Sequence, residues 1–155
     1  MNPSIQQMLN RYTCENENDY INAIREIMQE LALQGLWRGK FFEHAAFYGG
    51  TALRILYGLN RSSEDLDFSL LSPNPEFHLS TYSKAIKREL ESFGFSTEFV
   101  TKGKVQHTNI ESAFLKTNTK MQLISIGLPN GITSRIHSKT ELKIKLEIDI
   151  DPPPG

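Results

Sequence analysis

The sequence is poor in cysteine, lacks long hydrophobic runs and has no excess of charge of either sign. Cys14 is the only cysteine among 155 residues, which excludes a disulfide framework and a thiolate metal cluster and favours a reducing compartment, the cytoplasm. No apolar run approaches the roughly 20 residues that cross a bilayer, and the N-terminus lacks a signal-peptide stretch, so we expect no membrane partner. With 17 basic and 18 acidic residues, the net charge of -1 creates no overall field that attracts nucleic acid. Any anionic ligand must therefore be bound locally.

The length and the apolar periodicity predict one compact domain of mixed secondary structure. Apolar residues at helical spacing predict two amphipathic helices, one between Asp19 and Gly35 and one carrying Phe77 to Phe93. Trp37, after the first helix, is expected to pack in the core. Strands are predicted for "FEHAAFYGG", "DLDFSLL", "FSTEFVTK", "TNIESAFLKT", "KMQLISIGL" and "TELKIKLEIDID". The fold class is therefore α+β.

A pair of glycines, Gly49 and Gly50, precedes a short helix predicted from Thr51 to Gly58. A glycine turn at a helix start exposes unpaired backbone N–H groups, and the helix dipole adds positive potential there. Such a turn suits phosphate, but glycine also occurs in ordinary strand-to-helix turns. Both interpretations stay open for the glycine pair alone.

Two carboxylates follow at the start of a predicted strand. Asp65 and Asp67 lie at positions i and i+2, so both side chains face the same side and could share hard cations such as Mg²⁺. An acidic pair at a strand start is also common as solvated surface.

A second acidic set occurs in "ELKIKLEIDID", where apolar and charged residues alternate. Glu147, Asp149 and Asp151 share one face, where three neighbouring carboxylates repel one another. A bound cation would reduce this repulsion, which makes Glu147 or Asp149 a candidate third metal ligand. The alternative is a half-exposed strand with a charged outer face.

The combination of "GGTALRILYGLNRSSEDLDF" and the later "KIKLEIDIDPP" resembles the AbiEii-type nucleotidyltransferase toxins of bacterial type IV toxin-antitoxin systems. The resemblance is close over residues 46–71 and fair over 139–154, whereas residues 1–45 match only as a helical lead-in. It implies a polymerase-beta-like nucleotidyltransferase fold, a small mixed sheet flanked by helices, as a single domain over residues 1–155. It also implies a reaction on a nucleoside triphosphate with Mg²⁺, and the chemistry of nucleotidyl transfer leads us to expect two ions.

The resemblance also implies roles for individual residues. The phosphates of the nucleotide would be held by the glycine turn and the residues that follow it, namely Gly49, Gly50, Thr51, Arg61 and Ser63. Apart from the resemblance, Lys145 lies next to Glu147 on the charged face and is a candidate point charge for the phosphates, with an ordinary surface lysine as the alternative. By the resemblance, the catalytic, metal-binding carboxylates would be Asp65, Asp67 and Glu147. Asp149 stays a candidate metal ligand because it shares the face of Glu147.

Several features of the function stay open in the sequence. The acceptor could be an RNA, including a tRNA, or a protein hydroxyl, and no stripe of aromatic and basic residues marks an RNA track. A cognate antitoxin is an expected partner. Members of the family generally continue into a helical C-terminal region, so we expect that region to be absent from a chain that ends at Gly155. The alternative function is a non-catalytic domain of this fold that binds a nucleotide or a partner.

Overall fold

A five-stranded mixed sheet forms the centre of the computed structural model, which describes residues 3–48, 65–102 and 109–153. The strand order is β1-β2-β5-β4-β3. β2 and β5 are parallel, and the other neighbouring strands are antiparallel. The strands are β1 (Ala45–Tyr48), β2 (Asp65–Leu70), β3 (Glu98–Lys102), β4 (Ile110–Asn118) and β5 (Glu141–Asp149). The predicted α+β class is confirmed.

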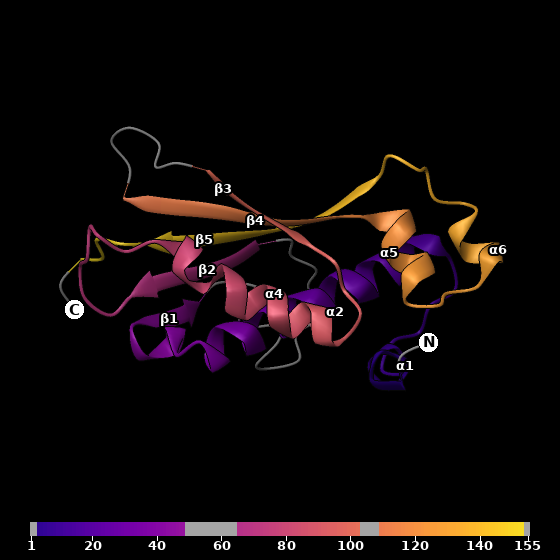
Figure 1. Cartoon of the computed structure of the whole chain (residues 1–155), viewed down its shortest axis with the longest axis horizontal. Helices are drawn as coiled ribbons and strands as arrows, with labels where there is room; N and C mark the ends of the chain where they lie inside the picture. The colour runs from indigo at the N-terminus through magenta and orange to yellow at the C-terminus, as the bar shows by residue number, and fades with distance from the viewer. Residues whose placement is uncertain (1–2, 49–64, 103–108, 154–155) are drawn as a thin grey trace.

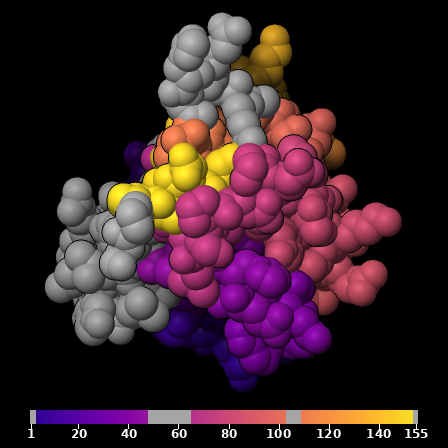
Figure 2. All heavy atoms as spheres, turned by 90° about the vertical axis from the view of Figure 1, so that its left-hand side faces the viewer, coloured from indigo at the N-terminus to yellow at the C-terminus, as the bar shows by residue number. Residues whose placement is uncertain are grey.

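Two helices, α2 (Glu17–Arg38) and α4 (Ser83–Ser92), pack together on one face of the sheet (Figure 1). Burial alternates along β2 and β5, so every second residue of both strands contributes to the core beneath these helices. Seen from the end of the sheet in Figure 2, the last residues of β5 lie between the chain that follows β2 and the start of β4. The other face of the sheet carries the charged residues.

The first long helix begins close to its predicted start but extends beyond Gly35. The Asn16 side chain accepts a hydrogen bond from the backbone N–H of Asp19 and caps the helix. Gly35 does not end the helix; it is buried where α4 crosses, and a Cβ there would approach the Cα of Ile86 to 2.8 Å. The glycine is therefore explained by close helix packing.

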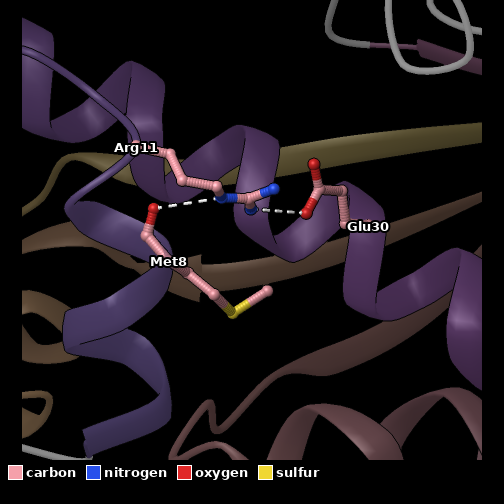
Figure 3. A network of polar contacts seen from close by, with 3 residues as sticks. All are labelled: Met8, Arg11 and Glu30. Carbon is pink, nitrogen blue, oxygen red and sulfur yellow. Dashed lines mark hydrogen bonds and ion pairs between the residues drawn. The ribbon is translucent and has the colours of Figure 1, made fainter.

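A smaller group of helices packs at the end of the molecule opposite the end of β5 (Figure 1): α1 (Pro3–Leu9), α5 (Thr119–Ser125) and α6 (Asn130–Thr133). Arg11, just after α1, joins this group to α2. Its Nε donates to the carbonyl of Met8 at 3.4 Å, and its Nη2 contacts Glu30 Oε2 at 2.8 Å (Figure 3).

The segment "KMQLISIGL" forms helix α5, so the strand prediction was wrong. The Asn118 side chain caps α5 by accepting from the backbone N–H of Met121. Gln122 stabilises the helical arrangement because its amide bonds Gly94 and Ser96 through their backbones. Local alternation of apolar residues could not reveal these contacts with residues distant in sequence.

Two further predictions need correction. The second amphipathic helix is shorter than predicted, because a 3-10 turn, η2 (Leu79–Tyr82), precedes α4 and Phe77 lies before both. Trp37 is 66% exposed and does not pack in the core. A second 3-10 turn, η1 (Phe41–Glu43), places Phe41 in the core before β1. None of the helices in the described ranges has the length and apolar character needed to cross a membrane.

Candidate active site

The parallel pairing of β2 with β5 brings two acidic strands side by side. Asp65 lies opposite Lys145, and Asp67 lies opposite Glu147. All four residues are only partly buried, whereas the residues between them belong to the core. The carboxylates of Asp65, Asp67 and Glu147 therefore share the face that α2 and α4 do not cover.

Asp67 is the carboxylate most affected by its surroundings. Partial burial raises its pKa above the ordinary value, and the charges of Glu147 and Asp65 raise it further. A hydrogen bond with Glu147 acts in the same direction, whereas the charge of Lys145 acts against it. The pair formed by Asp67 and Glu147 thus disfavours a second negative charge.

Lys145 provides positive charge within the same cluster. Its Nζ lies 2.5 Å from Oε1 of Glu147, and this hydrogen bond raises the pKa of the lysine. The side chains of both residues remain about one third exposed, at 34% and 30%. The ion pair orients the Glu147 carboxylate beside Asp67.

Asp149 shares the face but lies farther along β5, opposite Ser69. Its Oδ1 accepts a hydrogen bond of 3.0 Å from the backbone N–H of Asp151. Asp149 therefore helps to terminate the strand, and one of its oxygens already has a partner.

Within residues 3–48, 65–102 and 109–153, no three His, Cys, Asp or Glu side chains form a group that could hold a metal ion. The metal-ligand roles of Asp65, Asp67, Glu147 and Asp149 therefore stay predictions. Of the predicted nucleotide-binding residues, Lys145 is described, and its role stays a prediction. The others lie outside the described residues: Gly49, Gly50, Thr51, Arg61 and Ser63.

Residues 31–155, which include all the described members of this cluster, match the family described as "Nucleotidyl transferase AbiEii toxin, Type IV TA system". The chain belongs to the AbiEii toxin family. This membership confirms the resemblance found in the sequence.

A crystal structure described as that of a "putative nucleotidyltransferase from H. pylori" is similar to this AbiEii family member, with 19% identity and a TM-score of 0.47. The match covers 86% of this chain and 47% of that chain, so the present chain spans less than half the length of that structure. No curated protein matches the sequence.

The structure of this AbiEii chain also gathers residues that the sequence did not single out. Phe114 of β4 lies opposite Lys145, on the same face as the carboxylates. Lys102 of β3 reaches the same ring. Phe114, Lys102 and Lys145 come from three separate strands, so no continuous stretch of sequence contains the cluster. In the sequence, only the alternation of residues along β4 could have indicated that Phe114 faces away from the core.

Proposed function

We propose that this AbiEii chain provides the catalytic face of a nucleotidyltransferase toxin that moves a nucleotidyl group from a nucleoside triphosphate to an acceptor hydroxyl. The observation that carries the proposal is the pairing of Asp67 with Glu147 across parallel strands, beside Asp65. Together with family membership over residues 31–155, this arrangement favours phosphoryl chemistry over a solvated acidic surface.

The chemistry of the cluster fits a divalent cation. Carboxylate oxygens are the ligands that Mg²⁺ prefers, and Asp65, Asp67 and Glu147 offer them on one face. The raised pKa of Asp67 shows that its negative charge is disfavoured among its neighbours, and a cation would reverse this effect. The three carboxylates do not by themselves form a group that could hold a metal ion in the described structure, so we propose that they bind Mg²⁺ with phosphate oxygens of the triphosphate as further ligands, and that two ions bind during the reaction.

Glu147 is a better candidate than Asp149 for the third carboxylate. It lies directly opposite Asp67, whereas Asp149 lies opposite Ser69 and accepts a backbone hydrogen bond at the strand end. Lys145 orients Glu147 and would keep positive charge close to the phosphates of a bound nucleotide.

Bound Mg²⁺ would stabilise the negative charge that develops on the transferred phosphorus centre and on the leaving pyrophosphate. The residues of the chain orient the reactants. The strand pairing fixes the positions of the carboxylates, and the glycine turn, with Arg61 and Ser63, would bind the triphosphate. We propose an RNA or protein acceptor, a cognate antitoxin as the controlling partner, and action in the cytoplasm.

A transfer assay tests the proposal. The protein is incubated with each radiolabelled triphosphate and either total RNA or total protein, in MgCl₂ or in EDTA. We expect labelling only in MgCl₂, loss of labelling in Glu147→Gln and labelling retained in Asp149→Asn. Labelling in EDTA would refute the metal-dependent reaction. Binding of triphosphate without transfer would favour the alternative, a non-catalytic binding domain.

A further inference from the structure

An aromatic ring lies on the charged face of the sheet, away from the core. Phe114 is half-buried on β4, between Val100 of β3 and Lys145 of β5. The partly buried aromatic residues that pack against the core do not include it. The aromatic pairs formed by the described residues also leave it out, since all of them join rings between Phe41 and Tyr82. Core packing therefore does not explain Phe114.

Two lysines flank this ring. The Nζ of Lys102 lies 5.1 Å from the ring centroid, and that of Lys145 lies 6.0 Å away. Both distances fall within the range of cation–π attraction. Lys102 is exposed, and its ammonium can also reach a ligand over the ring. An aromatic surface with two adjacent cations matches the chemistry of a nucleobase joined to phosphates.

The ring lies beside the proposed active site. Phe114 is on β4, β5 carries Glu147, and β2 carries Asp67, so the ring is two strand spacings, about 10 Å, from the strand of the paired aspartates. The position is on the flank opposite β1. The predicted triphosphate turn directly follows β1 in the sequence. A donor nucleotide and an acceptor must approach the reacting phosphorus from different sides, and among the described strands β4 lies on the side of β2 and β5 away from β1.

We propose that Phe114 and Lys102 form a platform on which a base of a single-stranded nucleic-acid acceptor stacks, with Lys102 bound to its phosphate, while Lys145 flanks the ring and keeps its ion pair with Glu147. This inference rests on the proposed nucleotidyl transfer and selects a nucleic acid over a protein as the acceptor. The geometry favours a base because a stacked base typically strengthens binding by about 5- to 100-fold, whereas an exposed cation–π contact contributes about two- to fivefold. A bound base can thus replace Lys102 over the ring while that ammonium moves to a phosphate, and Lys145 stays paired with Glu147.

Direct binding measurements test the platform without requiring catalysis. Fluorescence anisotropy follows a fluorescein-labelled single-stranded RNA oligonucleotide binding to the whole chain in EDTA. We expect Phe114→Leu to weaken binding about tenfold and Phe114→Tyr, which keeps an aromatic face, to bind like the wild type. Trp37→Leu is the matched control, because Trp37 is exposed on α2, which packs on the other face of the sheet, and we expect no change.

A second variant tests the phosphate contacts independently of the ring. Lys102→Gln should reduce the slope of log K against log salt by about 0.7, the amount expected for one phosphate contact with a single strand. Thermal unfolding of each variant verifies the fold. An abasic oligonucleotide should bind wild type and Phe114→Leu equally, since it has no base to stack.

Equal RNA affinity of wild type and Phe114→Leu would overturn the proposal. A tenfold loss of triphosphate binding in Phe114→Leu would also overturn it, by assigning the ring to the donor nucleotide. If Phe114→Leu lost label transfer to a protein while its RNA binding was unchanged, the proposal would be overturned in favour of a protein acceptor. Asp67→Asn separates this test from the proposed function, because it should abolish transfer and leave RNA binding intact.

Discussion

Replacing Asp67 with asparagine should abolish nucleotidyl transfer and leave the fold intact. Asp67 lies directly opposite Glu147 and next to Asp65 on the same face, and its surroundings disfavour its charge. Like charges directly opposite each other on paired strands cost roughly 0.2–1 kcal/mol. Asparagine removes this repulsion and can still donate a hydrogen bond to Glu147. In metal-free buffer, we expect the free energy of unfolding to rise by up to about 1 kcal/mol.

Addition of Mg²⁺ should make the wild type more stable to unfolding than Asp67→Asn, the reverse of the order expected in metal-free buffer. A cation bound only to the folded wild type at ten times its Kd adds about 1.4 kcal/mol to the free energy of unfolding. Asp67→Asn should gain much less, because a charged ligand has been removed. If the site contributes at least about 3 kcal/mol of transition-state stabilisation through its metal, transfer should fall by at least about 100-fold.

Urea unfolding with and without MgCl₂, together with the labelled-triphosphate assay, measures both effects. Glu141→Gln is the matched control, since it removes a carboxylate from the same face of β5 but from an exposed ion pair with Lys143. We expect this control to change stability by no more than about 0.5 kcal/mol in either buffer. A folded Asp67→Asn protein that transfers label at the wild-type rate, or that is destabilised in metal-free buffer, would refute the reasoning.

Three further predictions concern packing, buried polarity and thiol reactivity. Gly35→Ala should lower the free energy of unfolding by about 1–3 kcal/mol in urea titrations, because its Cβ would clash with the backbone at Ile86, and a gain in stability would contradict this packing. Glu111 is 5% exposed and accepts a hydrogen bond from the backbone N–H of Leu79, so Glu111→Ala should cost about 1–3 kcal/mol more than Glu111→Gln; equal losses would contradict this role. Burial raises the pKa of the Cys14 thiol, so less thiolate is present at a given pH, and iodoacetamide should alkylate the folded protein more slowly than the protein in urea; equal rates would contradict the burial.

The sequence predicted those parts of the fold in which local pattern and tertiary environment agree. Apolar and polar residues alternate in β2 and β5 because one face of the sheet is covered. This two-residue repeat predicted both strands and placed Asp65 and Asp67 on the same face. The strand prediction for the segment that forms helix α5 was wrong, because this helix is stabilised by hydrogen bonds between Gln122 and backbone groups more than 20 residues away. Gly35 was predicted to end the first helix because glycine often follows a helix C-terminus. The sequence of α2 alone does not show that α4 packs closely against this glycine.

The candidate site was predicted unevenly for a similar reason. Family resemblance pointed to Glu147, and the register of β5 against β2 then placed it opposite Asp67. The choice between Glu147 and Asp149 could not be made from alternation, because both residues share one face. Phe114 was missed because its neighbours on the sheet, Lys102 and Lys145, lie 12 and 31 positions away in sequence.

The central position of β5 connects the stability of this fold with its proposed chemistry. Within the described sheet, β5 lies between β2 and β4 and so joins the β1-β2 pair to the β4-β3 pair. Its buried side contributes a continuous apolar row to the core, and its other side carries the partly exposed Lys145 and Glu147. The acidic cluster and the Phe114 platform therefore cannot form before β5 has paired on both edges. Because β5 pairs with β2 across 80 positions of sequence, from Asp65 to Lys145, the proposed active site should form late in folding, together with the core.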